Sequence, residues 1–116
     1  MEKFHGFVVE ESLKESEVLS SFEILGRKSN HRTIVKIAIE PYDIRNGIRR
    51  LQSNLKQGYF FHVYKDDKMI VVFKDRQFWI STDRETWEPA IRYGLEIGLS
   101  KEELDFKPTK LSEEDF

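Results

Sequence analysis

Three short apolar runs separated by charged pairs constrain the fold of this chain more than any other feature. The runs cover residues 59–65, 68–74 and 77–82, and the pairs are Asp66-Asp67 and Asp75-Arg76. Such runs, rich in aromatic and β-branched residues, predict three antiparallel strands joined by tight hairpins. With two-residue turns, one face of these strands would carry Phe60, His62, Tyr64, Met69, Val71, Phe73, Phe78 and Ile80. The other face would carry Tyr59, Phe61, Val63, Ile70, Val72 and Trp79. Both faces are apolar, so other parts of the structure must cover both of them.

Residues 42–57 contain the clearest helical pattern. The apolar positions step by four, three and four, which makes one apolar stripe of Ile44, Ile48, Leu51 and Leu55. Pro41 suits the first turn of a helix, where its missing N–H costs nothing. Gly58 suits the left-handed position that closes a helix.

A second long helix is expected over residues 87–98. Pro89 lies within its first turn, and its packed stripe would contain Trp87, Ile91, Leu95 and Gly94. Ser100 and Glu103 then repeat the capping-box spacing before a short turn that ends near Leu104 or Phe106.

The N-terminal third has two interpretations. Residues 4–9 predict a strand, and the capping-box spacing of Ser12 and Glu15 predicts a short helix that ends near residue 20. Residues 22–28 and 33–40 flank a polar loop, which favours a β-hairpin. In the alternative, the helix continues to Leu25 with Gly26 as its cap. The pattern therefore leaves open whether residues 21–28 are strand or helix.

These elements predict an α+β fold in one domain, residues 1–107. We expect a largely antiparallel sheet of five or six strands in the order βαββαβββα, with the two long helices on one face. The second face would be covered by the N-terminal segment, by the tail or by a second copy of the chain. A second copy would form a homodimer through Tyr59, Phe61, Val72 and Trp79. Residues 108–116 are expected to form a mobile acidic tail.

Composition excludes several classes of protein. Cysteine is absent, so the chain has no disulfide framework, zinc–thiolate site, iron–sulfur cluster or catalytic thiol. No secretory leader is visible at the start, and the longest apolar run, residues 69–73, is too short to span a bilayer. We therefore expect a cytoplasmic protein without a membrane partner. Charged residues make up 34% of the chain, a level that is typical of proteins from thermophilic prokaryotes.

The middle of the chain is basic, although the whole chain has a net charge of −2. Residues 27–58 contain eight Lys and Arg against two Asp and Glu, and both ends of the chain are acidic. The candidate residues for binding nucleic acid or another anion are Arg27, Lys28, Arg32, Arg45, Arg49 and Lys56. Our default interpretation is that these cations form the solvated side of ordinary elements, because charged helical stripes are usually just solvated.

His62 is the single candidate for a catalytic residue. The three histidines are not spaced as a metal-binding pair, and residues 26–29 lack the first glycine of a phosphate-binding loop. Residues 57–64 carry aromatic residues like those of an RNA-recognition strand, but Phe60 replaces the small residue that such a strand needs. We expect no metal and no cofactor. A histidine flanked by aromatic residues is more often a neutral core residue than a proton-transfer group.

The strings EESL, GYFFH, MIVVF, YGLEIGL and EELDF resemble a family of small prokaryotic proteins of about this length. The resemblance implies a compact domain and brings no activity with it. Together these observations favour a non-enzymatic binding or assembly module. The alternatives are a nucleic-acid-binding protein that uses residues 27–56, and a small enzyme centred on His62.

Overall fold

The three apolar runs form a meander. In a computed structural model that describes residues 3–29, 31–66, 68–81, 83–102 and 104, the strands are β4 (Phe60–Lys65), β5 (Lys68–Phe73) and β6 (Gln77–Ile80). Lys65 pairs with Lys68, as a two-residue turn requires. Val72 pairs with Gln77, and the Phe73 N–H donates to Arg76 O at 2.7 Å, so the second turn is centred on Lys74-Asp75, one residue earlier than expected. The difference shifts the pairing by an even number of residues, and the predicted division of side chains between the two faces is therefore correct.

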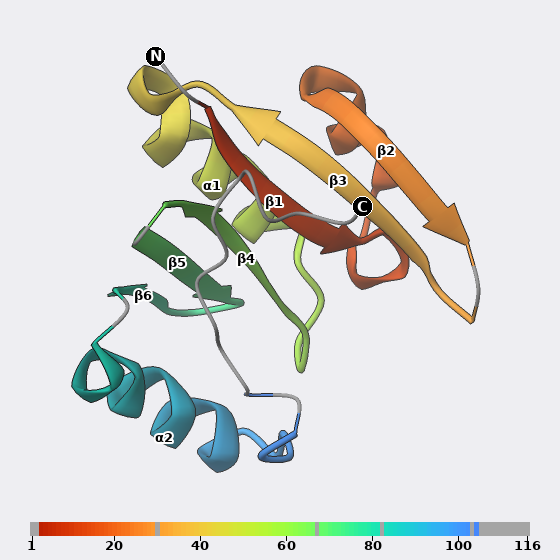
Figure 1. Ribbon diagram of the computed structural model, residues 1–116. Helices are drawn as coiled ribbons and strands as arrows, with labels where there is room; N and C mark the ends of the chain where they lie inside the picture. Colours follow the sequence, from red (N-terminus) through yellow and green to blue (C-terminus); the bar gives the residue numbers. More distant parts are fainter. Residues whose placement is uncertain (1–2, 30, 67, 82, 103, 105–116) are drawn as a thin grey trace.

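The meander is one half of a six-stranded antiparallel sheet (Figure 1). The other strands are β1 (Phe4–Val9), β2 (Glu23–Ser29) and β3 (Thr33–Ile39), and the order across the sheet is β2-β3-β1-β4-β5-β6. The hairpin interpretation of residues 22–40 is confirmed, and the helical alternative is wrong. At Gly6, an added Cβ would lie 2.6 Å from Val63 Cγ1. Glycine at this position therefore lets β1 lie close to β4 at the centre of the sheet.

The chain between β1 and β2 differs from the expected helix. It forms two 3₁₀ turns, η1 (Glu10–Ser12) and η2 (Ser16–Ser21). Ser12 Oγ donates a hydrogen bond to the carbonyl of Val9 and caps no helix. Leu13 instead pairs with Leu55 in an isolated bridge, which the Lys14 N–H strengthens by donating to Asn54 O at 2.7 Å. This bridge holds the chain extended, so a continuous helix cannot form there.

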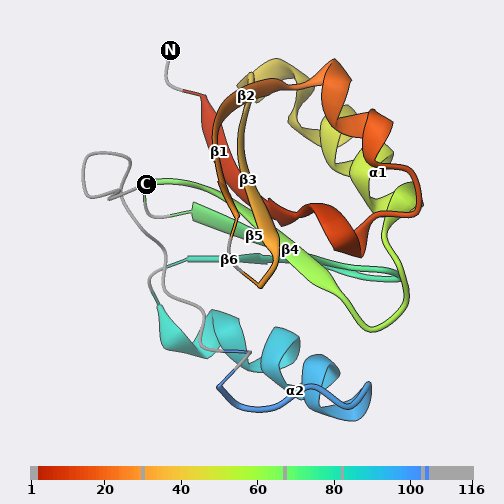
Figure 2. The same cartoon turned by 90° about the vertical axis from the view of Figure 1, so that its right-hand side faces the viewer.

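The two long helices lie on opposite faces of the sheet (Figure 2). The first comprises η3 (Pro41–Asp43) and α1 (Ile44–Asn54), and the second comprises η4 (Arg84–Trp87) and α2 (Glu88–Glu96). Helix α1 packs on Phe61, Val63, Ile70 and Val72. Helix α2 packs on Met69, Val71, Phe73 and Ile80. The expectation that both helices share one face is wrong, because each apolar face of the meander receives its own helix.

The ends of the two helices also differ from the sequence pattern. Ile44, Ile48 and Leu51 are buried as predicted, but α1 ends at Asn54 because Leu55 is extended. Gly58, with φ of 88°, turns the chain into β4 and does not cap the helix. On α2 the buried positions are Ala90 and Gly94, whereas Leu95, expected on the packed stripe, is 41% exposed.

Leu104 covers α2 at Gly94 and is buried. The expected end of that turn at Phe106, and the expected tail of residues 108–116, lie outside the described residues. None of the described helices is long and apolar enough to cross a membrane.

Candidate functional site

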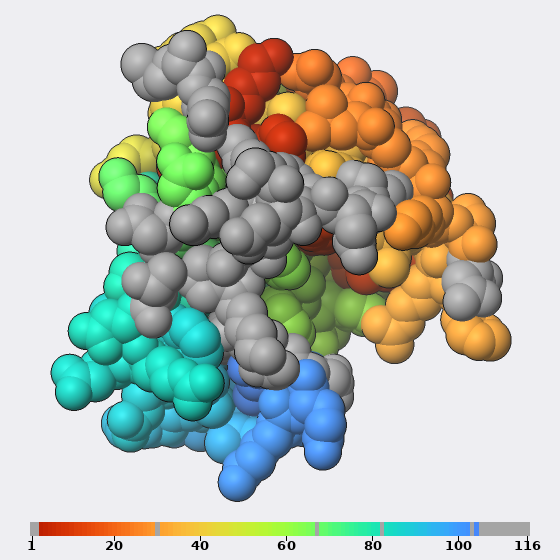
Figure 3. All heavy atoms as spheres, viewed as in Figure 1, coloured from red at the N-terminus to blue at the C-terminus, as the bar shows by residue number. Residues whose placement is uncertain are grey.

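A groove of about 580 Å³ opens on the face of the sheet that carries α2. It lies where β1, the start of β3 and the start of β4 meet the chain that leaves α2. Its lining residues are Phe7, Val9, Arg32, Ile34, Gly58, Tyr59, Phe60, Phe61, His62 and Leu99. Figure 3 shows the green surface of β4 between the orange β2–β3 hairpin and the blue segment that follows α2. The groove brings together the side chains of three residues that the sequence singled out separately, namely Arg32, Tyr59 and His62, whereas the side chain of Phe61 packs under α1 on the other face of the sheet.

The far wall of the groove is set by the end of α2. Gly98 adopts φ of 98°, a left-handed conformation that suits glycine. Its N–H donates to Leu95 O at 3.1 Å, and the Leu99 N–H donates to Gly94 O at 3.0 Å. This pair of hydrogen bonds is the Schellman motif, which commonly directs the residue after the glycine back toward apolar neighbours. Leu99 is accordingly packed against the same apolar cluster as α2.

His62 forms part of the groove from the middle of β4. It pairs with Phe7 of β1, and its ring centroid lies 6.0 Å from the rings of both Phe7 and Tyr64. Burial among these aromatic rings lowers the pKa of His62 from 6.5 to about 4. Among the described residues, no group forms a hydrogen bond with either ring nitrogen. The imidazole is therefore neutral near pH 7 and offers one donor and one acceptor.

Among the described residues that line the groove, Arg32 is the one with a cationic side chain. It is exposed in the turn between β2 and β3, immediately before Thr33. Glu11 lies beside it and accepts a hydrogen bond from the Thr33 N–H at 2.9 Å. That hydrogen bond and, more weakly, the charge of Arg32 hold the pKa of Glu11 below its ordinary value. The positive charge of the Arg32 guanidinium at the mouth of the groove is thus partly offset by the exposed Glu11 carboxylate.

The six basic residues predicted to bind an anion do not form one surface. Arg27 and Lys28 are consecutive on β2 and so point to opposite faces, and Arg27 pairs with Glu10 at 3.2 Å. The Lys56 ammonium donates to Glu11 O at 3.0 Å. Arg45 and Arg49 are exposed on α1, and α1 covers the other face of the sheet. Arg32 is the one of these six residues that lines the groove.

The four residues predicted to form a dimer interface are also separated. Phe61 and Val72 are buried within the chain under α1. Tyr59 lies at the groove, and Trp79 is 50% exposed on β6. The premise of the dimer prediction was an uncovered second face, and this premise is wrong because α1 covers that face.

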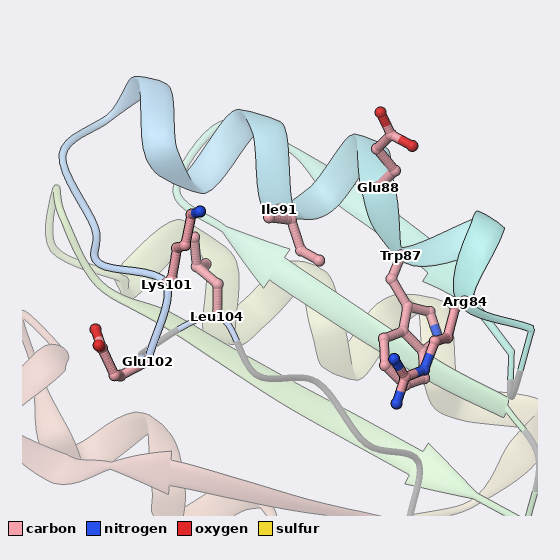
Figure 4. A pocket seen from close by; sticks show the side chains of 7 residues that line it. All are labelled: Arg84, Trp87, Glu88, Ile91, Lys101, Glu102 and Leu104. Carbon is pink, nitrogen blue, oxygen red and sulfur yellow. The ribbon is translucent and has the colours of Figure 1, made fainter.

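A second groove, of about 590 Å³, lies between α2 and the chain around residue 101 (Figure 4). Trp87, Ile91 and Leu104 point into it, and charged side chains such as Arg84 and Lys101 lie around its rim. The Trp87 indole N–H donates to Ser81 O at 2.5 Å, so the polar atom of this ring is already occupied. This groove contains no residue that the sequence singled out for binding. We therefore place the candidate site at His62.

Within the described residues, no group of three or more His, Asp or Glu side chains is arranged to hold a metal ion. Four residues of the groove were not singled out from the sequence: Phe7, Val9, Ile34 and Leu99. The Gly98-Leu99 pair after a helix is a recognisable cap signal, which could have placed Leu99 facing inward. Phe7 and Ile34 had no such signal, since they reach the groove through strand pairing between distant segments.

Comparisons with protein-family models, with curated proteins and with solved structures find no match for this chain. The interpretation of the groove therefore depends on its own chemistry.

Proposed function

We propose that this chain is a non-enzymatic binding domain whose groove receives a small ligand with a flat apolar body and one anionic group. The observation that carries the proposal is the composition of the groove wall. Aromatic and aliphatic side chains form the wall together with one neutral imidazole, and one guanidinium lies at the mouth. Ligand sites are typically apolar concavities of this size with a few polar groups that orient the ligand.

The chemistry of His62 argues against an enzyme. An efficient general base has a pKa near the working pH, and a pKa of about 4 makes the His62 imidazole a poor base near neutrality. The described lining contains no carboxylate, serine, threonine or lysine that His62 could activate or that could orient it. A nucleophile, a base and an orienting group are the minimum set for most hydrolytic and transfer sites.

The same groups suit a carboxylate on an aromatic or aliphatic body. Arg32 presents N–H donors in a planar fork that matches a carboxylate, and His62 supplies a further N–H inside the groove. Phe7, Tyr59 and Phe60 offer ring faces and edges on which a flat ligand can pack. Glu11 competes for Arg32, so the guanidinium should contribute a modest part of the affinity.

The proposal is tested with 2-naphthoate as the probe and with 2-naphthylmethanol as its neutral counterpart. Titration into ¹⁵N-labelled protein should shift the amide signals of Phe7, Leu99 and the start of β4. Arg32→Gln should weaken 2-naphthoate binding by about fivefold, which corresponds to one exposed charge interaction of about 1 kcal/mol. The same substitution should leave 2-naphthylmethanol unaffected.

Arg92→Gln is the matched control. It also removes an exposed guanidinium, but Arg92 pairs with Glu88 at 2.7 Å on α2 and does not line the groove. Absence of shifts in the groove at millimolar probe would refute the proposal. An equal loss of affinity for both probes in Arg32→Gln would refute the role assigned to the guanidinium.

A further inference from the structure

The side of α1 that borders β6 carries a second set of functional groups. The Arg45 guanidinium carbon lies 5.3 Å from the centroid of the Trp79 ring, and half of the Trp79 surface is exposed. Two turns further along, Gln52 donates to Phe73 O at 2.8 Å and accepts from the Gln77 amide at 2.8 Å. These contacts show that α1 runs alongside β6, with Arg45 near one end of the strand and Gln52 near the other. Arg49 is exposed on the helix between them.

Two lysines extend this set beyond the end of α1. The Lys74 ammonium lies 3.4 Å from Ser53 O, and the Lys14 N–H bonds to Asn54 O. Partial desolvation lowers the pKa of Lys74, and the positive charge of the neighbouring Lys14 lowers it further. The negative charge of Asp75 opposes this shift. Two like charges are therefore held together at the carbonyl end of the helix. We call Arg45, Arg49, Lys14, Lys74 and Trp79 the α1–β6 strip.

The cations of the α1–β6 strip lack the ion pairs that four other described cations form. The ion pairs among the described residues are Lys3 with Glu23 and Glu40, Arg27 with Glu10, Arg50 with Asp43, and Arg92 with Glu88. None of the strip's four cations forms an ion pair with a described carboxylate. Their charge is consequently available to an external anion, and binding would relieve the repulsion between Lys14 and Lys74.

We propose that the α1–β6 strip binds the phosphate backbone of single-stranded nucleic acid, with one base stacked on Trp79. From Arg45 to Ser53 the helix rises about 12 Å, so its cations can follow several consecutive phosphates. A half-exposed indole beside an arginine is the kind of platform on which unpaired bases stack. A duplex keeps its bases stacked inside the double helix, so its phosphates could contact the cations but none of its bases could stack on Trp79.

The first test is fluorescence anisotropy with a labelled dT12 oligonucleotide at low salt. The wild-type chain should bind in the micromolar range. Arg45→Gln with Arg49→Gln should weaken binding by about tenfold and reduce the salt slope by about 1.4, because each phosphate contact on a single strand contributes about 0.7. Trp79→Leu should weaken binding by about tenfold while the salt slope stays unchanged, because stacking releases no counterions.

Arg84→Gln with Arg92→Gln is the matched control, because it removes two guanidiniums from the α2 side. In a Trp87→Phe background, Trp79 is the remaining tryptophan, and dT12 should quench its emission. Absence of dT12 binding at low salt would overturn the proposal. Equal binding of a duplex of the same length, or an unchanged dT12 affinity in Trp79→Leu, would overturn the single-strand assignment.

Discussion

Replacement of His62 by Phe should change how the stability of the domain depends on pH. Folding lowers the pKa of this histidine from 6.5 to about 4. Between these two values the unfolded chain binds a proton that the folded chain excludes. The stabilising effect is therefore complete above about pH 6.5 and is lost as the pH falls toward 4. His62→Phe keeps an aromatic ring in the groove wall and removes the titrating group.

The magnitude follows from the two pKa values. Linkage with 6.5 in the unfolded chain and about 4 in the folded chain gives a loss of about 2 kcal/mol between pH 7 and pH 5. Urea unfolding of both proteins at both pH values measures this quantity. The wild-type chain should lose about 2 kcal/mol more than His62→Phe over the interval, since the carboxylates contribute equally to both proteins.

His31→Gln is the control, because His31 is exposed in the turn between β2 and β3. It removes an imidazole that lies outside the groove, so comparison with His62→Phe isolates the effect of position 62. An equal loss of unfolding free energy in the wild-type chain and in His62→Phe would refute the argument that burial among Phe7 and Tyr64 desolvates the imidazole. It would also remove the chemical argument on which we propose a non-enzymatic groove.

Two further predictions concern packing. Leu51→Ala truncates a fully buried residue of α1 and should lower the free energy of unfolding by about 2–5 kcal/mol in urea. Leu95→Ala is the same truncation at an exposed position of α2 and should lower it by less than about 1 kcal/mol. Similar costs for the two variants would contradict the assignment of the buried faces. Gly6→Val should destabilise the domain by about 1–3 kcal/mol in thermal unfolding, because its Cβ would meet Val63 Cγ1 at 2.6 Å and the backbone oxygen of His62 at 3.1 Å. Unchanged stability would show that β1 and β4 are further apart than described.

The two candidate binding surfaces can be tested independently. The groove uses Arg32 and the α1–β6 strip uses Arg45 and Arg49, which belong to different faces of the sheet. Arg45→Gln with Arg49→Gln should therefore leave 2-naphthoate binding intact, and Arg32→Gln should leave dT12 binding intact.

Local periodicity was sufficient to predict much of this structure. A strand alternates its side chains between two faces, so Phe61 and Val72 could be assigned to one face and His62 to the other before any tertiary contact was known. The step of three and four residues in α1 identified Leu51 as a core residue in the same way. These features depend on neighbours within a few residues of each other, and the sequence displays them directly.

The tertiary structure decided which element covers each face and where the groove lies. Nothing local distinguishes a helix that packs above the sheet from one that packs below, so the sequence did not place α1 and α2 on opposite faces. The Leu13–Leu55 bridge overrode a plausible capping box at Ser12, because pairing between distant segments was stronger than the local signal. The groove likewise requires Phe7, His62 and Leu99 to meet through the pairing of β1 with β4 and the packing of α2. Contacts between residues so far apart along the chain are formed by the whole fold, and for that reason the site became visible only in three dimensions.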